Sequence, residues 1–81
     1  MNENEVLDKL QEIFQDVFGN AELKINKKTN SNDIDGWDSL THITILEAVQ
    51  DEFALRFSLD EMIELNDVGK IVDAIVLASS N

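Results

Sequence analysis

The sequence contains no cysteine, no proline and no tyrosine, and only three of its 81 residues are glycine. Without cysteine the chain forms no disulfide, builds no thiolate metal site and offers no thiol nucleophile. Proline and glycine are the residues that disfavour helices most strongly, so their scarcity fits an all-helical protein. A chain of this length has room for one domain, and we expect that domain to span residues 1–81.

Long apolar runs and a basic leader are also missing. The first five residues include two glutamates, which argues against a signal peptide. The longest apolar run, 74–78, is far shorter than the roughly 20 residues needed to cross a bilayer. We therefore expect a soluble, cytoplasmic monomer that does not insert into membranes.

Basic residues are few: six Lys and Arg stand against 17 Asp and Glu, which gives a formal net charge of −11. From residue 34 onward ten acids face only Arg56 and Lys70, a net charge of −8. Such a surface repels nucleic acid and anionic membranes and attracts basic partner proteins. Disorder is the alternative for so acidic a chain, but 43% hydrophobic residues in helical spacing argue against it.

Apolar residues recur every three or four positions in several segments, which predicts an all-α, four-helix bundle of three longer helices and one short helix. The first helix is expected over about 2–18, where Asn2 and Glu5 have the spacing of a capping box. Gly19 is its expected stop. The second helix is expected over about 39–53.

The short helix and the last helix follow. Ser58 and Glu61 form a capping box that opens the short helix, which is expected to end near Leu65. Asn66 or Asp67 is expected to cap the last helix. The final three residues, 79–81, are expected to form a fraying tail.

A long loop is expected between the first two helices, because residues 19–37 show no sustained helical period. A loop of this length in a compact domain usually has a function or is mobile. Three apolar residues are expected to pin it to the core: Leu23, Ile25 and Ile34. Three basic residues are expected to be solvated charges: Lys24, Lys27 and Lys28.

On a helical wheel the second helix has an apolar side and a solvent side. The apolar side groups Ile45, Leu46, Val49 and Phe53. The solvent side includes Leu40, Thr44, Glu47 and Asp51. An exposed leucine among acids has the character of a docking surface, although single exposed apolar residues are also common.

Ser39 lies at or next to the N-terminus of this helix, in the stretch Gly36-Trp37-Asp38-Ser39-Leu40. The first backbone N–H groups of a helix have no intrahelical partner, and the macrodipole places partial positive charge there. The position therefore suits a phosphate, either bound or covalently attached. The simpler interpretation is that Ser39 only caps the helix.

Two other chemistries, calcium binding and hydrolysis, have partial motifs in the sequence. Ser31, Asp33, Asp35 and Gly36 are spaced like the start of an EF-hand loop. The first ligand would then be a serine and the twelfth would be His42, where the motif requires Asp and Glu. An acidic calcium-binding or adaptor module remains the alternative function.

A small hydrolase would use Ser39 with His42, the only histidine. Such an enzyme also needs an orienting acid, an oxyanion hole and a cleft, for which this chain has little room. His42 projects toward the apolar side of the helix. It is expected to be a hydrogen-bonded histidine at the edge of the core, and no catalytic residue is expected.

Asp38-Ser39-Leu40 at the start of the second helix resembles the attachment motif of acyl carrier proteins and the related carrier domains of polyketide and nonribosomal peptide synthases. The resemblance covers almost the whole chain. It includes the acidic four-helix plan, the long first loop, Phe53 at the end of the second helix and Val68 at the start of the last.

The resemblance implies a prosthetic group, 4′-phosphopantetheine, which a phosphopantetheinyl transferase joins from coenzyme A to the Ser39 hydroxyl through a phosphodiester. The terminal thiol of that arm would carry an acyl group as a thioester. The protein would then be a carrier and a substrate of other enzymes, with no metal and no catalysis of its own.

The resemblance also implies roles for neighbouring residues. Asp38 would be read by the transferase and help to start the helix. An acyltransferase, a ketosynthase or an acyl or aminoacyl ligase would use basic patches to dock on Leu40, Thr44, Glu47 and Asp51. An apolar space between the second helix and the short helix would shelter the acyl chain, and its candidate lining residues are Leu46 and Met62.

Several positions differ from the pattern of fatty-acid carriers, which have acids after the Ser-Leu pair and in the middle of the second helix. Here Thr41, Thr44 and Ile45 stand in that stretch, and Ile63 stands in the short helix where an acid is common. Gly36 and Trp37 before the motif are similar to discrete carriers of specialised pathways. We expect a dedicated carrier for a polyketide, an aminoacyl group or an envelope-sugar acylation, more than a carrier for general fatty-acid synthesis.

Overall fold

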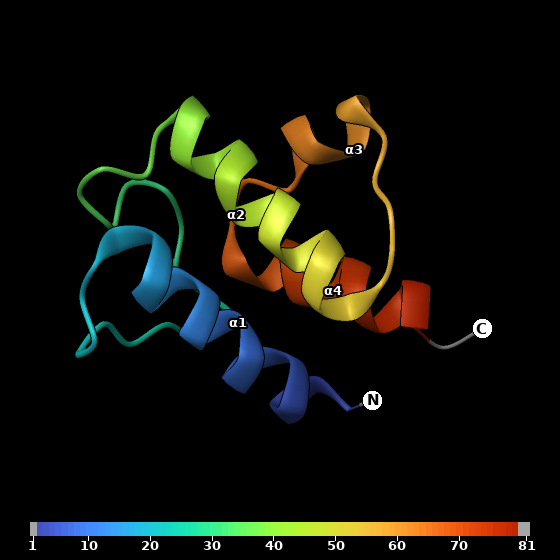
Figure 1. The fold of residues 1–81 in the computed structure, drawn as a ribbon, viewed down its shortest axis with the longest axis horizontal. Coiled ribbons are helices and arrows are strands. Elements are labelled where there is room, and N and C mark those ends of the chain that lie inside the picture. Colours follow the sequence, from blue (N-terminus) through green and yellow to red (C-terminus); the bar gives the residue numbers. More distant parts are fainter. Residues whose placement is uncertain (1, 80–81) are drawn as a thin grey trace.

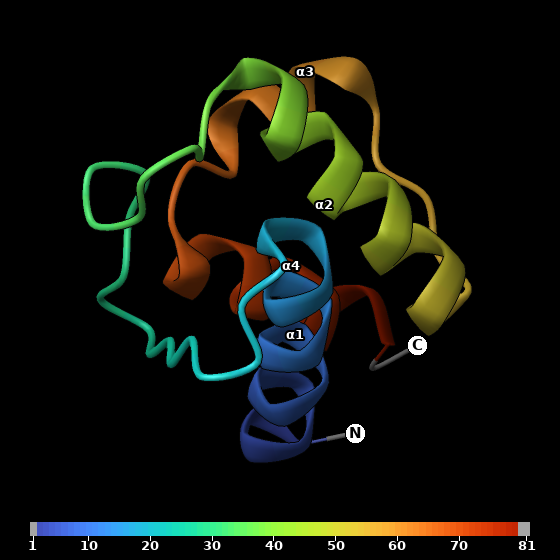
Figure 2. The ribbon, with the colours of Figure 1, turned by 60° about the vertical axis from the view of Figure 1, so that its left-hand side comes forward.

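The computed structural model describes residues 2–79, and its regular structure is helical (Figure 1). Its helices are α1 (Glu3–Phe18), α2 (Ser39–Phe53), α3 (Leu59–Glu64) and α4 (Val68–Ser79). α1 packs against both α2 and α4. The short α3 lies beside the first half of α2 in both views (Figures 1 and 2). The all-α fold with three longer helices and one short helix is confirmed.

Local caps set the ends of α1. The Asn2 side-chain oxygen accepts a hydrogen bond from the Glu5 backbone N–H at 2.9 Å, and the Asn2 amide donates to the Glu5 carboxylate at 2.8 Å. The second bond uses the side chain of Asn2, where a capping box would use its backbone N–H. α1 ends at Phe18, and its C-cap is Gly19, whose φ of 62° lies in the left-handed region that glycine adopts without a steric cost.

The later helices also begin at side-chain caps. Ser58 and Glu61 form the predicted capping box of α3. Asp67 is the residue that caps α4, since its carboxylate accepts a hydrogen bond from the Lys70 N–H at 2.7 Å. Ser79 is the last residue of α4 and its hydroxyl donates to the Val76 carbonyl, so the prediction that it begins the tail is wrong. Residues 80–81 of that predicted tail lie outside the described residues.

Side chains from α1, α2 and α4 form one core, in which ten are fully buried. These residues are Val6, Leu10, Phe14, Ile45, Leu46, Val49, Val68, Ile71, Val72 and Ile75. Ile25 and Ile34 of the long loop are buried against this core and Leu23 packs on it, as predicted. None of the helices described over residues 2–79 combines the length and the apolar character of a membrane span.

The long loop is fastened to α1 and α4 through polar contacts. The Val68 N–H donates to the Thr29 carbonyl at 2.9 Å. The Lys27 ammonium lies 2.9 Å from the Glu3 carboxylate and 3.0 Å from the Asp73 carboxylate. Lys27 remains partly exposed to solvent, as predicted, but the loop also brings it between acids of α1 and α4, and these ion pairs were not predicted. Lys24 and Lys28 are exposed, as predicted.

Candidate attachment site

Asp38 is the N-cap of α2. Its Oδ1 accepts hydrogen bonds from the backbone N–H groups of Leu40 and Thr41, each at 3.0 Å. The Asp38 N–H in turn donates to the Thr41 hydroxyl at 2.8 Å, which completes a capping box. Ser39 is thus the first residue inside the helix, and the interpretation that it only caps the helix is wrong.

These hydrogen bonds stabilise the charged form of the Asp38 carboxylate. The backbone N–H of Thr41 is the main cause, and the Thr41 hydroxyl and the Leu40 N–H add to it. Together they hold the pKa of Asp38 below its ordinary value. The start of α2 therefore carries a carboxylate that is fixed in direction and ionised at neutral pH.

Ser39 is exposed, and its hydroxyl makes no hydrogen bond to any other residue between 2 and 79. It lies at the rim of a hollow of about 220 Å³. The hollow is lined by residues from the long loop, the start of α2, α3 and the turn before α4: Ser31, Trp37, Asp38, Ser39, His42, Ile63 and Asn66. A free, exposed hydroxyl in this position is accessible to other molecules.

His42 is hydrogen-bonded through both ring nitrogens. Trp37 Nε1–H donates to His42 Nδ1 at 3.1 Å, and His42 Nε2 lies 2.7 Å from the Met62 carbonyl oxygen. The indole nitrogen can only donate, so Nδ1 accepts, and Nε2 carries the proton that is donated to Met62. The prediction of a satisfied histidine at the core edge is confirmed. Because neither nitrogen is free, His42 is not arranged as a base for Ser39.

The four candidate docking residues are all exposed on α2: Leu40, Thr44, Glu47 and Asp51. Leu40 has 76% of its surface exposed, and Ile63 of α3 has 65% exposed. Apolar side chains of this size on a small acidic protein are candidates for contact with a partner. The structure thus adds Ile63, which lines the hollow next to Ser39.

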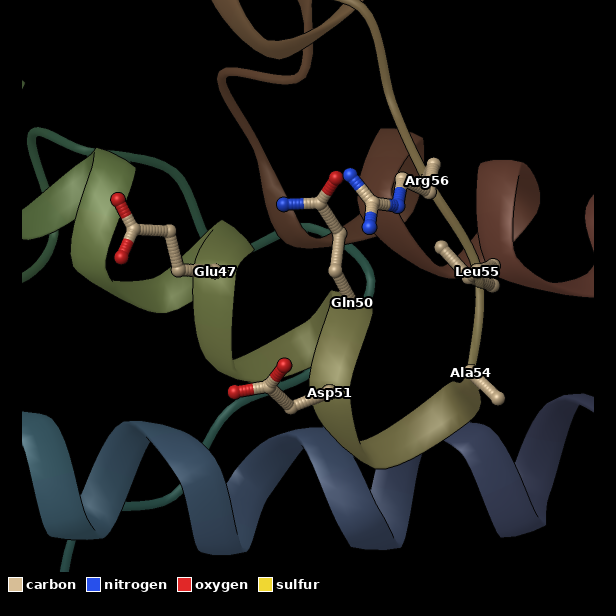
Figure 3. Close-up of a pocket in the computed structure, with 6 residues that line it drawn as sticks. All are labelled: Glu47, Gln50, Asp51, Ala54, Leu55 and Arg56. Atoms are coloured by element: carbon tan, nitrogen blue, oxygen red, sulfur yellow. The ribbon is translucent and has the colours of Figure 1, made fainter.

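Glu47 and Asp51 also border a second hollow of about 470 Å³, at the end of α2 (Figure 3). Arg56 lines it from the segment after α2, and its guanidinium points toward the Gln50 amide (Figure 3). In the sequence, Arg56 is one of only two basic residues from residue 34 onward. The sequence shows only that Arg56 is surrounded by acids along the chain, and it does not show that Arg56 lines one hollow with Glu47 and Asp51.

The two candidates for an acyl pocket are separated by the structure. Leu46 is fully buried and belongs to the core. Met62 is half-buried and packs against the core, while its carbonyl accepts the bond from His42. Neither lines the hollow beside Ser39, so their role in lining an acyl pocket stays a prediction. Within residues 2–79, no three His, Cys, Asp or Glu residues converge as a metal site would require.

Comparison with known proteins agrees with this arrangement. Residues 8–75 match the model of a family described as a phosphopantetheine attachment site. The fold is similar to the solution NMR structure of a holo acyl carrier protein from Geobacter metallireducens, with a TM-score of 0.84 and 32% sequence identity. The similarity covers 93% of this chain and 86% of that one.

The family has a defined chemistry. Its members carry a covalently attached phosphopantetheine and are modified by a phosphopantetheinyl transferase, and they deliver cargo to biosynthetic enzymes without being enzymes themselves. The match extends over most of the chain and includes the start of α2. The chain therefore belongs to the acyl carrier protein family of phosphopantetheine-bearing carriers.

Proposed function

We propose that residues 1–81 act as one carrier domain and that its phosphopantetheine is joined to the Ser39 hydroxyl. The observation that supports this most directly is the free, exposed hydroxyl directly after the capping Asp38. Ser58 also stands at the start of a helix, but its oxygen accepts the Glu61 N–H at 3.1 Å as the cap of α3. Ser79 donates to the Val76 carbonyl.

The start of α2 fits the group that Ser39 would hold. A phosphodiester carries one negative charge, and the positive end of the helix macrodipole favours an anion there. The N–H groups of Leu40 and Thr41 are already bound to Asp38, so the support for the phosphate comes from the dipole more than from direct hydrogen bonds. The attached arm supplies the thiol that carries the acyl group, since the chain has no cysteine.

Mass spectrometry tests the attachment directly. Purified protein is incubated with coenzyme A and a broad-specificity phosphopantetheinyl transferase, and the intact mass is expected to rise by one phosphopantetheine. The Ser39→Ala variant is expected to keep its unmodified mass. Ser58→Ala is the matched control, because it removes the other serine at a helix start and is expected to be modified. Modification of a folded Ser39→Ala protein would place the arm elsewhere.

The docking role proposed for Leu40, Thr44, Glu47 and Asp51 rests on exposure and charge. These side chains follow Ser39 along one face of α2, and the half of the chain that contains them has a net charge of −8. Charge of one sign accelerates the encounter with a partner of the opposite sign. The fitting partners are the transferase and the enzymes that load or use the acyl group, each with a basic patch next to its active site.

The rate of modification by the transferase tests this face. Glu47→Lys is expected to slow modification at low ionic strength, and Leu40→Ala is expected to slow it with less dependence on salt. Glu12→Lys on α1 is the matched control, because it makes the same change of charge on another helix. Equal rates for Glu47→Lys and Glu12→Lys would show that the transferase does not use this face of α2.

The pathway is proposed at a coarser level. Thr41, Thr44 and Ile63 stand where acids are common in fatty-acid carriers, which supports a dedicated carrier for a polyketide, an aminoacyl group or a related acyl transfer. The thioester recovered from the native host and identified by mass spectrometry tests this assignment. A mixture of long saturated acyl chains of different lengths would contradict it.

A further inference from the structure

We propose that this carrier is built for short, polar acyl groups, and that His42 closes the space between α2 and α3 to a long alkyl chain. The inference rests on the proposed attachment at Ser39. It concerns where the cargo lies once it is attached and which cargo the protein can shelter.

His42 connects three segments of the chain. It accepts a hydrogen bond from the Trp37 indole at the end of the long loop and donates one to the Met62 carbonyl in α3. The Trp37 and His42 rings stack, with centroids 6.0 Å apart and planes inclined by 26°. Trp37 is itself buried and packs edge-on against Phe14 of α1, with centroids 5.1 Å apart. The link across α2 and α3 is therefore anchored in the core.

α3 has few other attachments to the rest of the protein, because none of its six residues is fully buried and only Met62 among them packs against the core. Phe57 and Leu65, which flank the helix, are the nearest buried residues along the chain. An alkyl chain entering between α2 and α3 has to part His42 Nε2 from the Met62 carbonyl. It would then leave a polar N–H and a carbonyl facing hydrocarbon, which is unfavourable unless both find other partners.

The protein interior next to the His42–Met62 hydrogen bond is already filled by a side chain. Leu46 lies one turn after His42 on the same side of α2 and has no exposed surface. The space open beside Ser39 is the hollow of about 220 Å³. Pockets that bury a drug-sized ligand hold roughly 300–1,000 Å³, so this hollow alone suits a smaller group. A second open hollow of about 490 Å³ shares Ile63 and Asn66 with it, but no residue of α2 lines that second hollow, so it lies outside the space between α2 and α3.

The walls of the hollow are mixed in polarity. Trp37 and Ile63 supply apolar surface, while Ser31 and Asn66 supply a hydroxyl and an amide. The Ser31 hydroxyl and the Asn66 amide N–H₂ donate no hydrogen bond to another residue between 2 and 79. These groups are available to a cargo that carries a hydroxyl, carbonyl or amino substituent close to the thioester. A plain hydrocarbon chain would make no hydrogen bond to them and would leave them to water.

The melting temperature of loaded wild-type protein tests the exclusion of long chains. The transferase is used with acetyl-, butyryl-, 3-hydroxybutyryl- and octanoyl-coenzyme A, and mass spectrometry confirms each product. A chain that is buried in the folded state stabilises the protein, whereas one that stays in solvent does not. We expect octanoyl protein to melt no higher than acetyl protein. A rise of about 4 °C or more, together with shifted Leu46 methyl resonances, would overturn the proposal.

His42→Val tests the link itself, because it removes both hydrogen bonds and introduces a compact apolar side chain. We expect octanoyl to raise the melting temperature of this variant relative to its own acetyl form. Ile63→Ala is the matched control: it lines the same hollow without bonding across the gap, and octanoyl is expected not to stabilise it. If octanoyl stabilises neither variant, His42 is not the closing residue. If His42→Val does not fold, the wild-type comparison still decides whether long chains are excluded.

Chemical shifts test the preference for polar cargo. Relative to butyryl protein, 3-hydroxybutyryl protein is expected to shift the Asn66 side-chain amide and the backbone amide of Ser31. Identical spectra for these two residues would overturn this part of the proposal. Failure of every loading reaction would instead contradict attachment at Ser39, which the mass measurement reveals before any melting curve is taken.

Discussion

Asp38 and Ser39 are neighbours with different tasks at the start of α2. The Asp38 carboxylate binds the N–H groups of Leu40 and Thr41, which would otherwise have no partner. The Ser39 hydroxyl is left free for chemistry. A serine acting as the cap would have its oxygen occupied by a backbone N–H, as Ser58 has in α3. The acid before the serine therefore frees the oxygen that is proposed to carry the arm.

Substitutions at Asp38 are expected to separate capping from charge. Asp38→Ala removes both and is expected to lower the free energy of unfolding at neutral pH. Asp38→Asn keeps an oxygen that accepts the same N–H groups and is expected to lose less stability there than Asp38→Ala. Urea unfolding followed by circular dichroism measures both. A loss for Asp38→Asn equal to that for Asp38→Ala would mean that the charge, and not the accepting oxygen, stabilises the helix start.

The free energy of unfolding, measured as the pH is lowered, tests the pKa of Asp38. We call the acidic part of this curve its acid limb and the alkaline part its alkaline limb. Since that pKa is lower in the folded than in the unfolded chain, the carboxylate stabilises the fold above its ordinary value of 3.8. This contribution is lost as the pH falls through the lower pKa of the folded state. Asp38→Asn is expected to flatten the pH dependence of the free energy of unfolding in that range. An unchanged acid limb would contradict the role assigned to the Asp38 hydrogen bonds.

At the scale of the element, the ends of the helices were predictable because their signals are local. Asn2, Asp38, Ser58 and Asp67 each cap a helix by binding an N–H two or three residues ahead. The free Ser39 hydroxyl and the exposed Leu40 also follow from position on one helix. Such features need only the spacing of neighbouring residues, which the sequence contains.

Contacts between distant segments were not predictable in the same way. Lys27 pairs with Asp73, and His42 bonds to Met62, across 46 and 20 positions of the chain. Each pair depends on how the long loop and α3 settle on the longer helices. The hollow beside Ser39 is likewise made by segments that meet only in the folded chain. Ser39 was predictable from the sequence, but the contribution of Ser31, Ile63 and Asn66 to the lining of the hollow was not.

Gly69 is expected to be necessary where the long loop touches α4. A Cβ at this position would lie 2.6 Å from the Lys27 carbonyl oxygen, a backbone atom that cannot rotate away. Alanine is otherwise favoured over glycine in a helix by about 1 kcal/mol, while overpacking costs about 1–3 kcal/mol. We expect Gly69→Ala to lower the free energy of unfolding by about 1 kcal/mol as the balance of these two effects.

Urea unfolding measures the Gly69→Ala effect, and Ala78→Gly serves as its control. Ala78 is an exposed residue of the same helix, so its substitution reports the helix preference without a contact to the loop. A Gly69→Ala protein more stable than the wild type would show that the loop can withdraw from α4 at little cost.

The Lys27 pairs give a second prediction for the loop. The hydrogen bonds that the Lys27 ammonium donates to the Glu3 and Asp73 carboxylates raise the pKa of Lys27 above its ordinary value of 10.5. The ammonium therefore stabilises the fold fully below that value, and the contribution is lost as the pH rises through the higher pKa of the folded state. Lys27→Met is expected to flatten the alkaline limb of the stability curve, with a small loss at neutral pH because the pairs are exposed.

Lys28→Met is the matched control for this measurement, since Lys28 is the exposed neighbour and its side chain makes no ion pair within residues 2–79. Thermal unfolding across alkaline pH follows both variants. If Lys28→Met changes the alkaline limb as much as Lys27→Met does, the effect comes from net charge and not from the bonds to Glu3 and Asp73.

At the scale of the whole molecule, the net charge of −11 has two opposite consequences. Repulsion among the acids destabilises the compact state, while the same field draws in basic partners. Salt screens both, with a Debye length of about 8 Å at 0.15 M ionic strength. Added sodium chloride is therefore expected to raise the melting temperature of the domain and, in the same range, to slow its modification by the transferase.

Two pairs of substitutions separate these effects. Glu12→Gln with Glu22→Gln removes two exposed charges outside α2 and is expected to reduce the salt dependence of the melting temperature. Glu47→Gln with Asp51→Asn removes the same charge from the proposed docking face and is expected to reduce the salt dependence of the modification rate as well. If both pairs alter that rate equally, the transferase responds to the total charge of the protein. If the α2 pair changes the salt dependence of the modification rate more, the transferase responds to the charges of the proposed docking face. The same charges would then both destabilise the fold and attract the partner.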